Sequence, residues 1–207
     1  MNSAVASLLD ALQALPMLEA AAVVLAITYL LLAARENILC WYCAFVSTAF
    51  YTVLFWDVSL LMESALNVYY MAMAFYGWRQ WRYGGSDHTG VSIRTLTANQ
   101  HAAIMCGIAV LTFVSGYLLS HNTGAAWPYV DSFTTWASVI TTVLVAKKYL
   151  ENWIYWFVID AVSIPLYLER GLQLTAWLFG VYLVIVVVGY VTWQRHWQAQ
   201  NVRPAHA

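Results

Sequence analysis

Three side chains within a strongly apolar stretch carry the most informative chemistry of this sequence: Trp153, Trp156 and Asp160. Their spacing of i, i+3 and i+7 places two indoles and a carboxyl on one face of a helix. A carboxylate near the middle of a bilayer costs about 2.5–3.5 kcal/mol on insertion scales. We therefore expect Asp160 to face protein or water, at a site where the indoles can stack on a flat or cationic solute.

Two further features of the same stretch support a binding site at depth. Asn152 has a side-chain amide that can both donate to and accept from a carboxamide. Pro165 lacks an N–H and frees the carbonyl of Ala161, which predicts a kink five residues past Asp160. Kinked helices with polar groups at depth are where transporters bind their solutes. The alternative for both indoles is packing in a protein core.

The composition places these residues in an all-α membrane protein. The chain has 207 residues, of which 62% are hydrophobic and 9% charged, whereas soluble domains carry about 25% charged residues. Apolar stretches of nearly 20 residues predict seven transmembrane helices. We expect them at about residues 17–34, 38–55, 59–81, 100–119, 131–146, 151–168 and 172–193. Residues 1–16 are amphipathic in pattern and are predicted to lie at the membrane interface, with a disordered chain end as the alternative.

The basic residues predict the orientation of these seven spans. Eight of the nine Lys and Arg residues fall on the carboxyl-terminal side of the membrane, and only Arg170 falls on the other side. Cytoplasmic loops carry the excess of Lys and Arg, so the amino end is expected outside and the carboxyl end in the cytoplasm. The eight residues are Arg35, Arg79, Arg82, Arg94, Lys147, Lys148, Arg195 and Arg203.

An internal repeat divides the chain. A shift of 115 residues superimposes Glu36-Asn37 on Glu151-Asn152 and Trp41 on Trp156. The single fourth helix gives both triplets the same orientation, so the prediction is two parallel three-helix repeats joined by a linker helix, a 3+1+3 plan. The expected units are 1–16, 17–83 (first repeat), 84–127 (polar loop and linker helix), 128–197 (second repeat) and 198–207 (cytoplasmic tail).

The pattern Trp153-x-x-Trp156-x-x-x-Asp160 after a Glu-Asn pair resembles the W-x-x-W-x-x-x-N/D motif of the PnuC family of bacterial nicotinamide riboside transporters. Tyr76-Gly77-Trp78, Trp81 and the segment 193–197 are also similar, and the 3+1+3 plan is that of the SWEET sugar transporters. The resemblance implies a homotrimer of the inner membrane that takes up the riboside by facilitated diffusion. It also implies trapping of the vitamin by a cytoplasmic riboside kinase. Asp160 stands where many relatives carry Asn.

Other polar residues are weaker candidates for solute contacts. Asn67 and Tyr70 share a face of the third predicted helix, and Asn67 lies where an amide needs a partner. A helix–helix hydrogen bond explains Asn67 equally well. Asn37 and Trp41 are expected to line the same cavity from the first repeat, as the counterparts of Asn152 and Trp156.

Other classes of function are weaker in the sequence. No HxxxH, HExxH or G-x-S-x-G pattern and no ATP-binding motif occurs, so we expect no enzyme, no catalytic residue, no metal site and no cofactor. The sequence has no basic stripe with interleaved aromatic residues, so it does not predict nucleic-acid binding. Thiamine, another vitamin or a sugar remains an alternative substrate. A non-transporting, vitamin-binding membrane subunit is the alternative from another class.

Overall fold

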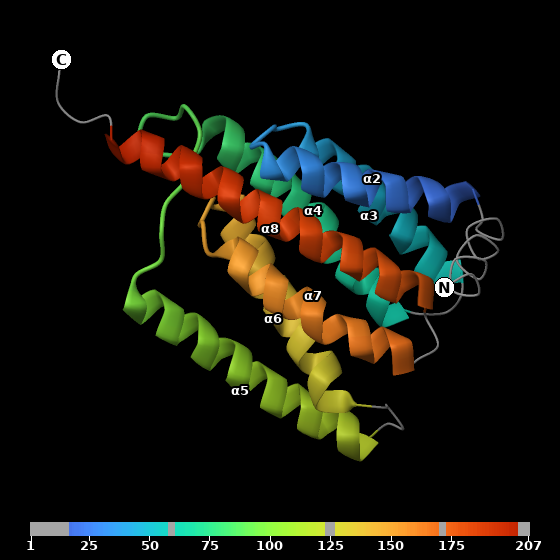
Figure 1. The fold of residues 1–207 in the computed structure, drawn as a ribbon. Helices are drawn as coiled ribbons and strands as arrows, with labels where there is room; N and C mark the ends of the chain where they lie inside the picture. Colours follow the sequence, from blue (N-terminus) through green and yellow to red (C-terminus); the bar gives the residue numbers. More distant parts are fainter. Residues whose placement is uncertain (1–16, 58–60, 123–126, 170–172, 203–207) are drawn as a thin grey trace, which may run out of the picture.

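A computed structural model describes residues 17–57, 61–122, 127–169 and 173–202 (Figure 1). These ranges are all-helical apart from turns, one extended connection and one isolated backbone bridge. The predicted interfacial segment, residues 1–16, lies outside them. The helices are α2 (Met17–Ala34), α3 (Cys40–Asp57), α4 (Leu61–Tyr83), α5 (Ala98–Asn122), α6 (Pro128–Ala146), α7 (Asn152–Glu169) and α8 (Gln173–Val202).

The predicted spans match these helices within a few residues, except at the carboxyl end. There α8 continues through the polar segment to Val202, well past the expected end of the second repeat at residue 197. The reason is local: residues 194–200 are mostly good helix formers, and no Gly or Pro interrupts them before Pro204. Pro165 lies inside α7, which stays helical to Glu169.

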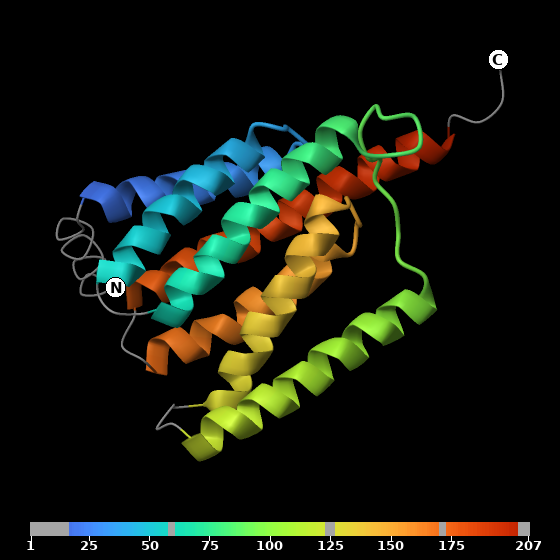
Figure 2. The same cartoon turned by 180° about the vertical axis from the view of Figure 1, so that it is seen from behind.

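Successive helices run in alternating directions, as Figures 1 and 2 show from opposite sides. Helices α2, α3 and α4 therefore have the same directions as α6, α7 and α8, with α5 as the single intervening helix. In each triplet the first helix packs against the second and the second against the third. The two triplets contact each other, because α2 packs on α8 and α6 packs on α4. The parallel 3+1+3 arrangement fits this packing.

The register between the repeats differs from the predicted shift of 115 residues. Glu36 and Lys148 both adopt left-handed backbone geometry, with φ of 54° and 52°. In each of the two turns, the amide of the following residue donates to a helix carbonyl five residues earlier, at 2.9 Å. The turns therefore correspond at a shift of 112 residues.

This register corrects the predicted counterparts. Trp41 is equivalent to Trp153 rather than to Trp156, and Asn37 is equivalent to Tyr149 rather than to Asn152. The sequence alignment paired the Glu-Asn pairs and matched Trp41 with Trp156, the second of the two indoles after Asn152, which shifts the register by three residues. The backbone of the turn is the better guide.

One end of the bundle collects the basic residues, and we call it the basic end. It comprises the α2–α3 turn, the α6–α7 turn, the start of α5 and the carboxyl-terminal ends of α4 and α8 (Figure 1). Residues 84–97, predicted only as a polar loop, cross this end and bury Ile93.

Three of the described helices, α2, α5 and α8, are long and apolar enough to cross a membrane on length and composition alone. The other four carry more polar residues, and several of these are turned inward within the bundle. Outward-facing positions are apolar, as the exposed side chains of α5 illustrate: Met105, Val110, Phe113, Val114 and Leu118. This inversion of the soluble pattern is expected for a bundle whose solvent is lipid.

Candidate functional site

The α7 face with the two indoles and the carboxyl is turned into the protein. Trp153 is 2% exposed and Asp160 is 3% exposed. The opposite face of α7 is lipid-like and exposed at Ile154, Phe157 and Val158. The carboxyl therefore lies among protein groups, the placement that the cost of a lipid-exposed carboxylate requires.

Trp153 has the contacts of a packing residue. A Cβ on Gly189 of α8 would lie 2.7 Å from its six-membered ring, so the indole fills the space that this glycine leaves. The ring also meets Trp193 edge to face, with centroids 5.4 Å apart. Contacts of this kind on several sides leave little indole face for a solute.

Trp41 repeats this arrangement in the first repeat. It packs over Gly77 of α4 and meets Trp81 edge to face at 5.4 Å. Trp41 and Trp153 belong to the same buried cluster at the basic end. Their contacts therefore favour a role in the core of the bundle.

The two asparagines hold turns. Asn152 is fully buried at the first position of α7, and its Nδ2 donates to the carbonyl of Tyr149 at 2.6 Å. Asn37 is exposed, and its Oδ1 accepts the N–H of Leu39 at 2.9 Å at the entry to α3. Both asparagines lie at the basic end, away from the middle of the helices.

Trp156 and Asp160 have different surroundings. Trp156 is half-buried and packs against both the basic-end cluster and a second cluster between α5, α6 and α7. Asp160 is eight residues past the first residue of α7, which corresponds to about 12 Å along the helix axis. No Lys, Arg or His pairs with its carboxylate within the described ranges.

One tyrosine, Tyr182 of α8, is a neighbour of the carboxyl. Tyr182 lies near enough to interact electrostatically with Asp160, and also with Tyr51 and Tyr167. On the other side of the bundle, Tyr29 interacts in the same way with Tyr70. These phenols come from α2, α3, α4, α7 and α8 and so from both repeats.

Polar side chains of α4 also lie near the contact between the two repeats. Asn67 is buried, and the neighbouring Tyr70 is half-buried. Tyr69 ties α4 to α6 through its hydroxyl, which donates to the carbonyl of Val139 at 2.9 Å.

The chemistry of this interior suits recognition of an organic solute. It offers one carboxyl, phenols and an amide, and the half-buried indole of Trp156 lies one helical turn from the carboxyl. Among the described residues, no three His, Cys, Asp or Glu side chains lie close enough to share a metal ion.

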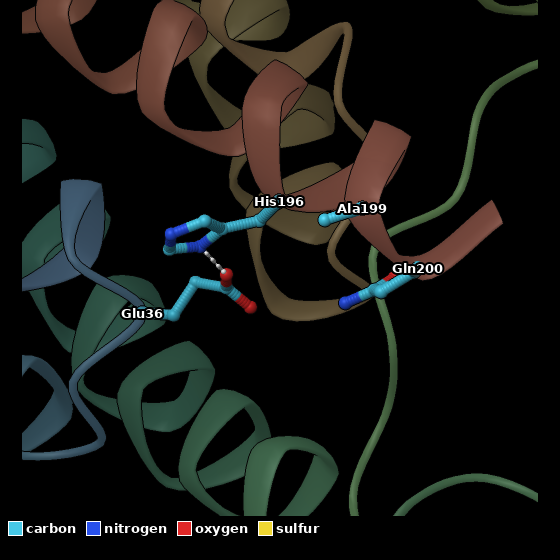
Figure 3. Close-up of a pocket in the computed structure, with 4 residues that line it drawn as sticks. All are labelled: Glu36, His196, Ala199 and Gln200. Atoms are coloured by element: carbon cyan, nitrogen blue, oxygen red, sulfur yellow. Dashed lines mark hydrogen bonds and ion pairs between the residues drawn. The ribbon is translucent and has the colours of Figure 1, made fainter. Parts of the chain in front are cut away.

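The sequence did not single out the polar cluster at the basic end. Oε2 of Glu36 lies 2.8 Å from Nζ of Lys148, and its Oε1 lies 2.6 Å from Nδ1 of His196 (Figure 3). Burial raises the pKa of Glu36, but the hydrogen bonds and charges of its two partners outweigh burial and hold that pKa below its usual value. The sequence does contain a signal for this ion pair, because Glu36 and Lys148 have opposite charges and occupy equivalent turns of the two repeats.

Two cavities flank the bundle. One of about 530 Å³ opens at the basic end and is lined by Glu36, His196, Ala199 and Gln200 (Figure 3). Another of about 230 Å³ is an apolar groove along α7 and α8, between residues such as Phe157 and Val187. Asp160 lines neither of them.

Comparison with known proteins assigns the family. The profile of a family described as nicotinamide mononucleotide transporter matches residues 16–195. A riboflavin/roseoflavin transporter, RibM of Streptomyces davaonensis, is 27% identical over 126 residues, 59% of each chain. The nicotinamide riboside transporter PnuC of Neisseria mucosa is 28% identical over 163 residues, 72% of this chain and 61% of that one. PnuC of Escherichia coli is 20% identical over 78% of each chain.

A solved structure agrees. The crystal structure of the vitamin B3 transporter PnuC superimposes with a TM-score of 0.66 and 26% identity, covering 86% of this chain and 83% of that one. The resemblance read from the Trp and Asp residues is thus confirmed over most of the chain. This chain is a member of the nicotinamide mononucleotide transporter, or PnuC, family of membrane transporters.

Proposed function

We propose that this protein takes up nicotinamide riboside across the inner membrane by facilitated diffusion, with cytoplasmic phosphorylation trapping the vitamin. The observation that carries the proposal is the buried carboxyl of Asp160, which has no cation paired with it among the described residues and stands one helical turn from the half-buried Trp156. A buried carboxylate needs a partner, and a cationic solute supplies one.

The chemistry of the riboside matches the interior. Its pyridinium ring is flat and permanently cationic, and a desolvated cation over an indole gains about 2 kcal/mol. Trp156 supplies the indole face, Asp160 the countercharge, and Tyr182 with Asn67 the hydroxyl and amide groups for the ribose and carboxamide. Trp153, Trp41, Asn152 and Asn37 support the site from the basic end.

The same interior disfavours the phosphorylated form. Among the described residues, no Lys or Arg pairs with Asp160, so none of them would neutralise a phosphate there. The mononucleotide formed by a cytoplasmic kinase would therefore stay inside. This asymmetry drives net uptake without an ion gradient and without direct use of ATP by the transporter.

We also propose an orientation in the membrane and an oligomeric state. The basic end faces the cytoplasm because positive residues favour that side, which places the carboxyl end inside and the amino end outside. We propose a homotrimer on the basis of the family resemblance. The exposed apolar side chains of α5 are compatible with contact between copies or with lipid.

Riboflavin is the second candidate, favoured by the similarity to RibM. Its ring system is flat and also suits an indole face, but it is uncharged, so it gives Asp160 no partner. Thiamine, which is cationic and aromatic, and glucose, which has neither property, complete a diagnostic set of solutes.

A binding titration tests the substrate directly. The purified protein is titrated with nicotinamide riboside, riboflavin, thiamine and glucose while Trp fluorescence is followed. We expect the tightest binding for the riboside and at least about tenfold weaker binding after Trp156→Ala, from lost stacking worth about 1–3 kcal/mol. Tighter binding of riboflavin than of the riboside would replace the proposed substrate.

A further inference from the structure

The two equivalent turns at the basic end are held in different ways. Residues 91–97, which we call the strap, bind the backbone of the α6–α7 turn. The N–H of Arg94 donates to the carbonyl of Lys148 at 3.1 Å, and the N–H of Leu150 donates to the carbonyl of Arg94 at 2.8 Å. The strap thus forms a short backbone ladder with this turn.

Side chains reinforce the strap. Nε of Arg94 donates to the carbonyl of Lys147 at 3.2 Å, and its guanidinium lies 4.3 Å from the ring centroid of Tyr149. Oε2 of Glu151 accepts the N–H of Leu96 at 3.0 Å. The α6–α7 turn is therefore fixed by both backbone and side-chain bonds.

In the described part of the chain, no comparable segment binds the backbone of the α2–α3 turn. Its backbone hydrogen bonds stay within the turn and its adjoining helices, apart from the carbonyl of Ala33, which accepts Nε1–H of Trp193 at 3.0 Å. Within the described ranges, its remaining polar contacts outside its own helix pair come from one side chain. Glu36 binds Lys148 at 2.8 Å and His196 at 2.6 Å.

We propose that the α2–α3 turn is the moving half of a gate at the basic end, and that Glu36 latches it to a fixed half formed by the strapped α6–α7 turn and α8. The inference rests on the proposed transport function, since a solute that crosses must leave at this end. Releasing Glu36 frees the turn from Lys148 and His196 together. The cavity of about 530 Å³ beside Glu36 gives the turn space to move (Figure 3).

Native Cys40 provides a reporter for this movement. It is the first residue of α3, four residues past Glu36, and it is fully buried when the latch is closed. A protein with Cys43→Ser and Cys106→Ser keeps Cys40 as its single thiol. Opening of the α2–α3 turn exposes Cys40 to N-ethylmaleimide, and the labelling rate is read by mass spectrometry without any solute.

We expect Glu36→Gln to speed Cys40 labelling at least about fivefold, because the closed form loses its charge-assisted bonds. Glu151→Gln is the comparison on the strapped turn, and it should leave labelling within about twofold because the backbone ladder remains. Asp87→Asn removes an exposed carboxylate at the same end and should also change nothing.

Unchanged labelling in folded Glu36→Gln protein, or equal acceleration by Glu151→Gln, overturns the gate. If Glu36→Gln does not give folded protein, Lys148→Gln is judged by the same fivefold criterion. The riboside titration separates the two proposals. If Glu36→Gln accelerates labelling but the protein binds no riboside, the gate is supported and the proposed substrate is contradicted. If labelling is unchanged but the protein binds riboside, the proposed substrate is supported and the gate is contradicted.

Discussion

Gly189→Ala should destabilise the bundle because of one contact. The added Cβ would lie 2.7–2.8 Å from three carbons of the Trp153 six-membered ring, closer than Cβ contacts occur in proteins. The indole is buried and pressed edge to face on Trp193, so it cannot swing away freely. Overpacking of this kind costs about 1–3 kcal/mol, more than the gain of up to about 1 kcal/mol from replacing Gly by Ala in a helix.

Gly180→Ala is the matched control, because the same substitution on the same helix meets nothing within 4 Å. The assay is thermal unfolding of both variants in one detergent, followed by near-ultraviolet circular dichroism of the indoles. We expect a lower Tm for Gly189→Ala and an equal or higher Tm for Gly180→Ala. If the two variants unfold at the same temperature, Trp153 is not the packing residue described above and returns as a candidate for solute contact.

Three further predictions concern the carboxyls and the cross-repeat contacts. Asp160→Asn should weaken riboside binding at least about tenfold and leave riboflavin binding within twofold, since only the cation loses a countercharge; calorimetric titration with both solutes measures this. Trp193→Phe removes the 3.0 Å hydrogen bond to the carbonyl of Ala33 and should lower the free energy of unfolding by about 0.5–1.5 kcal/mol, measured by thermal unfolding. An unchanged free energy of unfolding would show that this bond does not contribute to stability. The pKa of Glu36 is lowered in the folded protein, so its stabilisation is present above the ordinary pKa of 4.5 and is lost as pH falls below it. The wild type should therefore lose more Tm than Glu36→Gln below pH 4.5, and parallel pH profiles would contradict the pairing.

Helix content was predictable because it depends on composition. Apolar stretches and their flanking basic residues located the helices, as the match at Met17–Ala34 illustrates. The inward direction of Asp160 also followed from a general cost, that of exposing a carboxylate to lipid.

Which of the two indoles packs against α8 was not predictable from spacing. Trp153 and Trp156 lie three residues apart on one helix, yet only Trp153 faces the glycine of α8. That difference depends on Gly189, which lies 36 residues further along the chain. The repeat register failed for a related reason, because left-handed turns at Glu36 and Lys148 leave no single-letter signature.

The strap was also invisible in the sequence. Residues 84–97 are polar and contain glycines, a composition typical of an unattached loop. Its attachment depends on backbone bonds between Arg94 and the α6–α7 turn, and the geometry of a turn elsewhere in the chain decides whether such bonds form.

Counterflow in proteoliposomes tests the central claim most directly. Vesicles containing the protein are loaded with unlabelled nicotinamide riboside, and entry of external labelled riboside is followed over time. We expect transient accumulation of label in wild-type vesicles, its loss in Trp156→Ala and Asp160→Asn vesicles, and no accumulation when the mononucleotide replaces the riboside. Binding of the riboside without counterflow would identify a vitamin-binding subunit, and equal counterflow of the mononucleotide would contradict the proposed site.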